Sequence, residues 1–368
     1  MPEAAKTVLR NVRVFDGTTL TEPRTVVIDG TVIGEDPAGG REVDAAGGTL
    51  LPGLIDTHVH LHGPGDLDVL ASWGVTTALD MACWPVERVK ALREVTGSAD
   101  FRTAGLPAIG SGGHHAEMPA MPEDAVIRTP GDARRHVEAR VAEGADYVKG
   151  IAEAPGEGGP SAEALGALVE AAREHGLRTV VHAVSPGAFA VAVQSGAEFV
   201  THVPLAGPIR AEDVAAMKAA GQVSIPTITM MAAILTTGPL AGRFPIDGVL
   251  RNVADLHTAG VRILAGTDAN DDPAAPAAPR HGRSLHDEFE LLARAGLTHT
   301  EILRSATTDA ARAFGLRDRG AIAPGLRADL VLLDGNPVED ISATRAIRSV
   351  WCAGTEITPA SHRPGTEE

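Results

Sequence analysis

The feature that most constrains the fold of this chain is a regular alternation, between residues 53 and 320, of short apolar runs and longer amphipathic stretches. Short apolar runs are typical of buried parallel strands, and amphipathic stretches are typical of helices that cover such a sheet. Eight runs have the character of strands: 54–60, 76–81, 101–108, 146–151, 178–182, 199–203, 223–230 and 261–268. Helical patterns follow most of them, at 86–95, 132–143, 162–174, 211–220, 249–259 and 285–295. We therefore expect eight βα units in succession.

Eight such units over this length match the usual size of a closed (β/α)8 barrel, the TIM-barrel fold of the α/β class. The same pattern is also compatible with an open, doubly wound sheet. However, the Gly-x-Gly-x-x-Gly motif that is typical of such sheets does not follow an early strand. The segment 270–280 is rich in Pro and Ala, and it predicts a loop over the barrel mouth.

Both ends of the chain have the character of a small β domain. Short β-like runs separated by turn signals such as Asp16-Gly17 fill residues 7–48. A similar pattern returns at 320–335 and 347–352. We expect the two ends to share one sheet in a composite β-sandwich. Its N-terminal part would be residues 1–52 and its C-terminal part 321–368, with the barrel domain at 53–320 between them.

The charge balance argues against nucleic acid as a partner. The chain has 48 Asp and Glu residues against 32 Lys and Arg residues, and its formal net charge of -16 repels phosphate backbones. No apolar run approaches the ~18 residues of a membrane helix, and the first ten residues lack the pattern of a signal peptide. Cys83 and Cys352 are too far apart to indicate a disulfide framework. We expect a cytoplasmic protein without membrane or nucleic-acid partners.

Histidine and aspartate recur where the predicted strands end. His58 and His60 stand two residues apart on the first strand, so both imidazoles point to one side and can clip a metal ion. His182 and His202 end two further predicted strands, and Asp268 ends the eighth. The carboxyl ends of barrel strands converge on one face, where such barrels place their sites. There the carboxylate of Asp268 could hold a metal ion and accept a proton from water.

Lys149 is one of only four lysines in the chain, and it lies near the end of the fourth predicted strand in apolar surroundings. A lone ammonium is costly to bury there, so a desolvated lysine has a lowered pKa. Its neutral amine could react with carbon dioxide to give a carbamate, whose two oxygens can bridge two cations. A lysine that snorkels to solvent is the alternative. A single buried histidine is more often structural than a ligand, but this recurrence of His, Lys and Asp at strand ends indicates one metal site.

Several stretches are similar to motifs of the amidohydrolase superfamily, in its imidazolonepropionase-like and Xaa-Pro dipeptidase-like branch. Residues 51–61 (LPGLIDTHVHL) resemble the opening motif, and residues 144–149 (GADYVK) resemble the carboxylated-lysine segment. Residues 265–268 (AGTD) resemble the aspartate motif. Residues 320–325 (GAIAPG) with 328–331 (ADLV) resemble the return into the β-sandwich.

The resemblance implies the same barrel and β-sandwich, and a metal-dependent site with divalent metal ions, commonly zinc. Carried over residue by residue, it implies that His58, His60 and Asp268 hold one ion, that His182 and His202 hold the other, and that carboxylated Lys149 bridges the two. It also implies hydrolysis by a metal-activated hydroxide. Asp268 would be the general acid and base that takes a proton from water and returns it to the leaving nitrogen.

Four further residues are candidate substrate contacts. His114 and His115 are adjacent in the stretch GSGGHHAE, where dipeptidase-like relatives usually show one histidine. Either could orient a substrate carbonyl or support a metal ion, and either could simply face water. Arg283 and His286 follow Asp268 at a distance where a cation could meet a substrate carboxylate. A helix N-terminus capped by Ser284 explains the same residues.

These observations favour a dipeptidase-like amidohydrolase that cleaves an amide or peptide C–N bond in a small or modified peptide. A deaminase or cyclic-amidine hydrolase, including one that tailors a peptide natural product, is a second reading, but such enzymes usually need one metal ion and lack the strand-four lysine. A lactonase or phosphotriester hydrolase could use the same metal pair. A degenerate barrel that only binds a partner would be expected to lose a ligand. The expected partner is a small-molecule or peptide substrate, and a homo-oligomer is compatible with the sequence.

Overall fold

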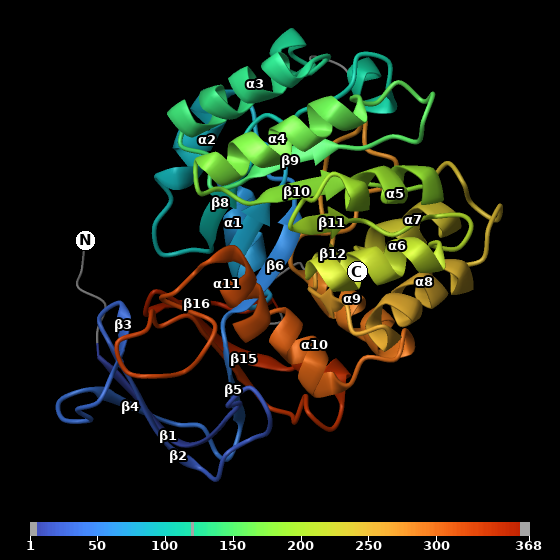
Figure 1. Cartoon of the computed structure of the whole chain (residues 1–368). Coiled ribbons are helices and arrows are strands. Elements are labelled where there is room, and N and C mark those ends of the chain that lie inside the picture. Colours follow the sequence, from blue (N-terminus) through green and yellow to red (C-terminus); the bar gives the residue numbers. More distant parts are fainter. Residues whose placement is uncertain (1–5, 119–120, 361–368) are drawn as a thin grey trace.

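The computed structural model describes residues 6–118 and 121–360 (Figure 1). Its strands are β1 (Thr7–Val14), β2 (Arg24–Asp29), β3 (Val32–Gly34), β4 (Arg41–Asp44), β5 (Thr49–Pro52), β6 (Leu54–Val59), β7 (Val75–Asp80), β8 (Asp100–Thr103), β9 (Val148–Ile151), β10 (Thr179–His182), β11 (Phe199–Thr201), β12 (Val223–Ile225), β13 (Arg262–Ile263), β14 (Leu330–Leu333), β15 (Ile347–Cys352) and β16 (Thr355–Ile357).

The helices alternate with the strands through the middle of the chain. They are α1 (Pro64–Ser72), α2 (Val86–Arg93), α3 (Pro130–Ala142), α4 (Ala162–Glu174), α5 (Pro186–Gln194), α6 (Ala211–Ala220), α7 (Ile228–Thr236), α8 (Asp247–Thr258), α9 (Arg283–Arg294), α10 (His299–Ser305) and α11 (Thr308–Phe314). Short 3-10 helices cover His114–Glu117, Glu123–Ala125 and Ile341–Arg345. The α/β class predicted from the alternation is confirmed.

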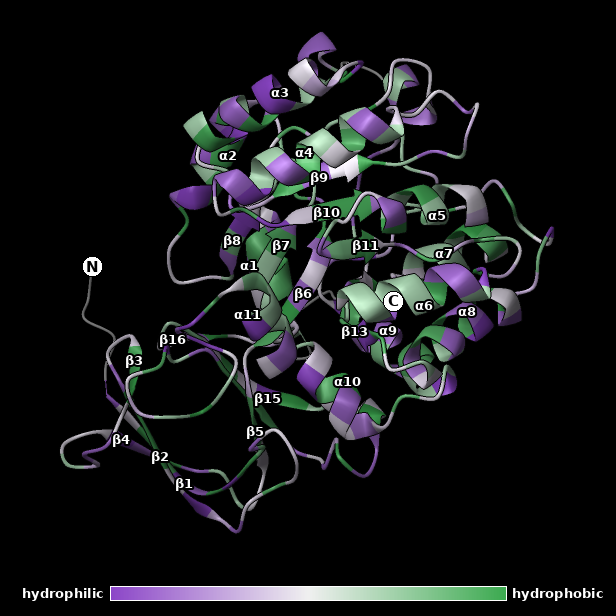
Figure 2. Ribbon diagram, viewed as in Figure 1, coloured by the Kyte–Doolittle hydropathy of each residue, from purple (hydrophilic) through white to green (hydrophobic). Residues whose placement is uncertain are grey.

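The eight central strands form two parallel sheets. One has the order β6-β7-β8, and the other has the order β13-β12-β11-β10-β9. Isolated parallel bridges lie between the sheets, from Val59 to Ala269 and from Ala108 to Gly150. Strands buried on both faces need apolar residues throughout, and Figure 2 shows β10 and β11 as largely hydrophobic, whereas α3 carries many hydrophilic residues.

Side chains from both parallel sheets pack into one buried cluster. Its members include Ile55 on β6, Leu79 on β7, Val180 on β10, Phe199 on β11 and Val223 on β12. Along each strand these residues alternate with others that point away from the cluster. The cluster therefore holds the two sheets face to face and fixes where their carboxyl ends lie.

Strands from the two ends of the chain join one sheet, as the sequence predicts. Its order is β16-β15-β14-β5-β1-β2-β3, and β4 pairs with β1. The connection between the ends is the antiparallel pairing of β14 with β5, in which Val331 is the register partner of Leu51. In Figure 1 the blue and red strands lie together below the central strands.

Two predicted strands are shorter in the structure by at least four residues, and a third prediction is wrong in its second half. The first two are β8, which ends at Thr103, and β13, which covers Arg262–Ile263 alone. β12 ends at Ile225, and residues that the apolar run assigned to it begin α7 instead. The carboxylate of Glu288 on α9 accepts a hydrogen bond from the backbone N of Ile228 at 3.0 Å. It therefore satisfies an amide in the first turn of α7, a tertiary contact that a local pattern cannot show.

No helix within residues 6–118 and 121–360 combines the length and the apolar character that crossing a bilayer requires.

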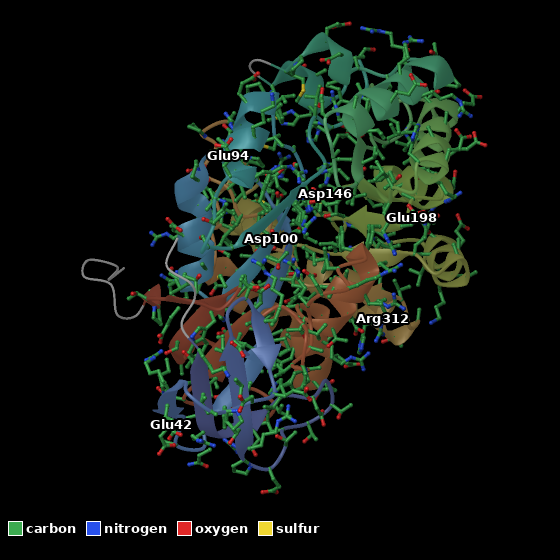
Figure 3. All side chains as sticks on the ribbon, turned by 90° about the vertical axis from the view of Figure 1, so that its left-hand side faces the viewer. Glu42, Glu94, Asp100, Asp146, Glu198 and Arg312 are labelled. Carbon is green, nitrogen blue, oxygen red and sulfur yellow. The ribbon has the colours of Figure 1, made fainter. Side chains whose placement is uncertain are left out.

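Arg319 ties the C-terminal segment to the central strands. Its side chain is 3% exposed, and Nη1 donates to Asp100 Oδ2 at 2.7 Å and to Thr77 Oγ1 at 2.9 Å. Asp100, labelled near the middle of the molecule in Figure 3, lies at the start of β8. Asp329, at the entry to β14, lies 3.8 Å from the same guanidinium nitrogen. One buried cation thus neutralises carboxylates from two parts of the fold.

We predict that Arg319→Ala lowers the free energy of unfolding by about 1 to 3 kcal/mol, because it removes a buried cation that Asp100 and Asp329 share and leaves them only Arg102 and Arg327 as partners. Urea unfolding followed by circular dichroism measures the change. The matched control is Arg317→Ala, whose side chain is exposed and whose loss should change stability by less than about 0.5 kcal/mol. Equal losses in the two variants would contradict this account of Arg319.

Candidate functional site

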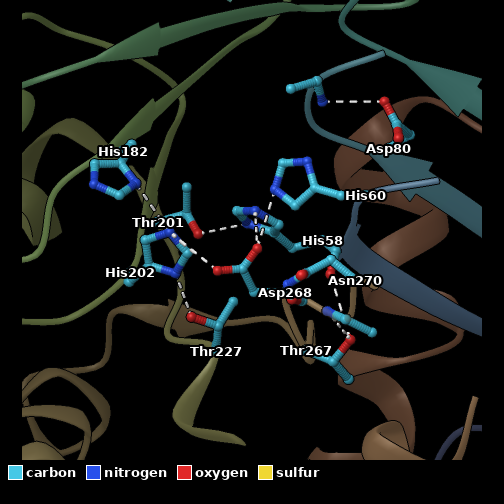
Figure 4. A network of polar contacts seen from close by, with 12 residues as sticks. His58, His60, Asp80, His182, Thr201, His202, Thr227, Thr267, Asp268 and Asn270 are labelled. Carbon is cyan, nitrogen blue, oxygen red and sulfur yellow. Dashed lines mark hydrogen bonds and ion pairs between the residues drawn. The ribbon is translucent and has the colours of Figure 1, made fainter. Parts of the chain in front are cut away.

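Three histidine rings and one carboxylate meet at the carboxyl ends of the central strands (Figure 4). Asp268 Oδ1 lies 3.2 Å from His58 Nε2 and 3.0 Å from His60 Nε2. Its second oxygen, Oδ2, lies 3.8 Å from His202 Nε2. Ligand atoms of His58, His60 and Asp268 all lie within 4.8 Å of one another, so a single metal ion could reach all three. The structure brings these four predicted residues together.

His182 and Lys149 extend this cluster along the neighbouring strands. Nδ1 of His182 lies 3.0 Å from Nε2 of His202, and the two rings meet edge to face. Lys149 lies on β9, where its register partner on β10 is Val180. Its Nζ is buried and has no hydrogen-bond partner among the residues that the structure describes. Since a buried ammonium without a partner is costly, burial lowers the pKa of Lys149 to about 7.

Two threonines fix the orientation of the histidine rings. The Nδ1 of His58 lies 2.8 Å from the Oγ1 of Thr201, and the Nδ1 of His202 contacts the Oγ1 of Thr227. If each Nδ1 donates to its threonine, each Nε2 carries a lone pair, which lies beside Asp268 in His58 and beside His182 in His202. A ring nitrogen that is held in this way leaves the other nitrogen available as a metal ligand. Sequence reasoning did not single out these threonines, although Thr201 directly precedes His202.

The backbone around Asp268 adopts a conformation that most residues avoid. Asp268 has φ of +58°, in the left-handed region, and such strain persists only where surrounding contacts impose it. The backbone N of Asp268 donates to the carbonyl of His58 at 2.7 Å, and the Nδ2 of Asn270 donates to the carbonyl of Asp268 at 2.9 Å. These contacts hold the carboxylate towards the histidines.

Asp56 and Thr267 connect the first strand to the segment that carries Asp268. The Oγ1 of Thr267 donates to Asp56 Oδ2 at 2.7 Å, and the backbone N of His58 donates to Asp56 Oδ1 at 3.2 Å. Burial raises the pKa of Asp56 to about 7, against the opposing effect of the hydrogen bond from Thr267. The sequence analysis does not identify Asp56 as a site residue. Its position two residues before His58, on the same face of the strand, could have indicated it.

Two further buried carboxylates support the site from behind. Asp80, at the end of β7, accepts hydrogen bonds from the backbone N of Leu61 and the Oγ1 of Thr103, both at 2.8 Å. Glu288 accepts a hydrogen bond from the Oγ1 of Thr229 at 2.7 Å and thereby fixes the start of α7, next to Thr227. Burial raises the pKa of both carboxyls. The position of Asp80 at the end of a predicted strand could have indicated a role at the site. No feature of the sequence around Glu288 indicates such a role.

The electrostatics of the cluster suit a divalent cation. Burial, reinforced by the nearby charge of Lys149, holds the pKa of His58 well below its usual value, and burial lowers the pKa of His202 to about 3. Burial alone would raise the pKa of Asp268, but His58 and His202 outweigh it and hold that pKa well below its usual range. Neutral imidazoles with an ionised carboxylate form a donor set that zinc prefers. The residues present therefore fit a metal ion.

His115 reaches this cluster, whereas His114 does not. The ring of His115 meets the ring of His182 edge to face, with centroids 4.8 Å apart, and its Nδ1 lies 3.7 Å from Glu153 Oε1. His114 is exposed, and its ring centroid lies 6.0 Å from that of His115. Of the two adjacent histidines, His115 is the one placed next to a predicted ligand.

Arg283 and His286 both lie on α9. Arg283 is exposed at the first residue of α9, which follows Gly282, so Ser284 is not the cap of that helix. His286 is buried, with Nδ1 2.9 Å from Thr344 Oγ1 and Nε2 3.0 Å from the carbonyl of Trp73. Both ring nitrogens therefore have partners inside the protein, and the substrate contacts of Arg283 and His286 stay predictions.

Comparison with known proteins agrees with this geometry. The sequence model of the amidohydrolase family matches residues 49–358. The chain is 33% identical over 203 residues to an imidazolonepropionase of Deinococcus deserti, a match that covers 54% of this chain and 46% of that protein. The match therefore spans less than half of that relative's length.

Two solved structures have the same fold. A Xaa-Pro dipeptidase with bound methionine in the active site has a TM-score of 0.82 and 22% identity, over 96% of this chain and 99% of that chain. A prolidase complexed with N-methylphosphonate-L-proline has a TM-score of 0.80 and 25% identity, over the same shares of the two chains.

The lowered pKa of Lys149 predicts a pH dependence of stability. Between about 7, the pKa of the buried amine, and 10.5, its ordinary value, the unfolded chain binds a proton that the folded chain does not. Stability from this group therefore rises with pH across that window. Lys149→Met has no amine at this position. Its free energy of unfolding should exceed that of the wild type by the largest amount at about pH 7, and the difference should shrink towards pH 10.

Urea unfolding at several pH values, with chelator and without carbon dioxide, measures the difference. Lys90→Met at an exposed position is the control. A difference for Lys149→Met that stays constant with pH would refute the prediction.

Proposed function

Because this chain belongs to the amidohydrolase family, whose members are hydrolases, we propose that it cleaves an amide or peptide C–N bond in a small or modified peptide. The observation that carries the proposal is the convergence of His58, His60 and Asp268, whose ligand atoms lie within 4.8 Å of one another at the carboxyl ends of the strands. Parallel α/β folds bind their substrates at that edge.

The proposed architecture is a closed (β/α)8 barrel at residues 53–320, with a composite β-sandwich from residues 1–52 and 321–368. Two observations support closure of the barrel. The bridges from Val59 to Ala269 and from Ala108 to Gly150 lie at the two gaps between the parallel sheets. The shared cluster of buried side chains lies between the same sheets. Pairing of β14 with β5 supports a terminal domain built from both ends.

The proposed cofactor is a pair of zinc ions. His58, His60 and Asp268 would hold one ion, His182 and His202 the other, and Lys149, carboxylated on Nζ, would bridge them. The unpartnered, buried Nζ of Lys149 supports this role because its lowered pKa favours the neutral amine that a carbamate requires. Bound zinc would supply an acidified water and a polarised scissile carbonyl.

Asp268 is the proposed general acid and base. Its pKa lies well below the usual range, so the carboxylate is ionised and can accept a proton from the attacking water. The same oxygen can then return the proton to the leaving nitrogen. The threonines behind His58 and His202 keep the rings fixed during this transfer. Asp268 itself stays oriented because its backbone is held by His58 and Asn270.

The solved structures favour peptides as substrates, because the two described above are named as a Xaa-Pro dipeptidase and a prolidase. The identity to an imidazolonepropionase favours a second candidate, a cyclic-amidine hydrolase. Lys149 argues for the first candidate, since its buried amine suits a bridged pair of ions rather than a single one. A lactonase that uses the same site is a third candidate that no observation favours specifically.

Turnover of a panel of dipeptides, N-modified dipeptides, cyclic amidines and lactones by the zinc-loaded protein tests the proposal. We expect release of a free amine from a peptide or modified peptide. Turnover confined to cyclic amidines would move the activity to the second candidate. Hydrolysis of lactones alone would refute C–N cleavage.

Asp268→Asn should lower kcat by at least about 100-fold, because it removes the proton acceptor while an amide oxygen remains to hold the metal ion. Kinetics should be measured alongside metal content, so that loss of the ion is not mistaken for loss of the base. The control is Asp272→Asn, which keeps an acceptor for the backbone N of Ala274 and should retain full activity. Full activity of metal-loaded Asp268→Asn would show that another group moves the proton.

A further inference from the structure

Glu153 lies at the mouth of the site in a cradle of glycines. It follows β9 by two residues, and thus stands four residues after Lys149 along the same strand direction. A Cβ on Gly113 would lie 3.0 Å from Glu153 Oε1, and one on Gly159 would lie 2.8 Å from Glu153 Cβ. The backbones of two loops therefore approach this side chain closely. They hold the carboxylate in place, with only 13% of the side chain exposed.

The carboxylate has little inside the protein to neutralise it. Among residues 6–118 and 121–360, its ion-pair partner within 4.0 Å is His115, whose Nδ1 is 3.7 Å away. That distance exceeds a hydrogen bond, and Nδ1 of His115 has no hydrogen-bond partner in the same part of the chain. A carboxylate so far withdrawn from water is costly unless a cation or several N–H donors meet it.

The pair adjoins the catalytic cluster. The ring of His115 meets His182 edge to face, and His182 in turn lies 3.0 Å from His202. A substrate whose scissile bond lies at Asp268 would therefore extend past His182 and His115 towards Glu153. Charged groups that meet at short range in a partly dry pocket interact more strongly than they do in water.

We propose that Glu153 binds a positively charged nitrogen of the substrate, an ammonium or a guanidinium, close to the scissile amide. The inference rests on the proposed C–N hydrolase function and narrows its substrate class to cationic peptides. An ammonium offers three donors to the two carboxylate oxygens and supplies the positive charge that Glu153 lacks nearby. The cation can come from a free amino terminus or from a basic side chain.

Two matched substrate pairs separate these sources. The first pair is alanyl-leucine and N-acetyl-alanyl-leucine, and the second is N-acetyl-lysyl-leucine and N-acetyl-norleucyl-leucine. For the pair that carries the recognised cation, the wild type should prefer the cationic member. Glu153→Gln should raise KM for that member by about tenfold or more and leave its neutral partner unchanged. Glu153→Asp should retain part of the preference, and Glu157→Gln, at an exposed position in the same loop, should retain all of it.

Binding without turnover keeps this inference separate from the proposed reaction. Calorimetry on Asp268→Asn, with and without Glu153→Gln, measures the affinity of the same pairs whether or not they are cleaved. A cation preference that disappears with Glu153→Gln supports the inference even if no peptide is cleaved. Equal binding or turnover of both members of each pair by the wild type would overturn the inference. An equal effect of Glu153→Gln on both members would overturn it too, because Glu153 would then be a positioning residue for His115. Failure of every member to bind counts against it as well.

Discussion

The carboxylate of Asp268 faces three imidazoles inside a part of the protein from which water is largely withdrawn. In such surroundings a charge persists only where fixed partners meet it, so the positions of the histidines and of the carboxylate depend on one another. Burial lowers the pKa of His58 and His202 against the opposing effect of Asp268, and the nearby imidazoles lower the pKa of Asp268, so these residues make a ready set of metal ligands. The left-handed backbone at Asp268 is the local strain that this arrangement requires.

Buried carboxylates from other elements keep that arrangement rigid. Asp56 joins β6 to the segment before Asp268, Asp80 joins the ends of three strands, and Glu288 fixes the turn that carries Thr227. Each accepts several hydrogen bonds, mainly from backbone N–H groups, which compensates for part of its desolvation. The face that carries the candidate ligands is therefore held by hydrogen-bonded supports on β6, β7 and α9 as well as by the strands themselves.

The sequence predicts residues whose role follows from their place on one strand. It does not predict residues whose role depends on contacts between distant elements. The eight strands were predicted in their places, and His58, His60, His202 and Asp268 were predicted to converge, because strand-end residues of parallel strands meet at one edge. Glu288 could not be found, since its contact with α7 joins elements 60 residues apart. For the same reason the apolar run 223–230 predicts one strand where the chain turns into α7. The internal partners of His286, Thr344 and Trp73, likewise lie far along the chain, so the sequence does not show them.

If Lys149 and the histidines form one site for two metal ions, the metal content per chain shows it directly. Protein purified without added metal and its Lys149→Ala variant should be compared by elemental analysis and by an unfolding check. The account predicts about two ions per wild-type chain, falling towards one or none in the variant while the fold is kept. A single ion that is retained equally by both proteins would contradict a lysine-bridged pair and favour a mononuclear site.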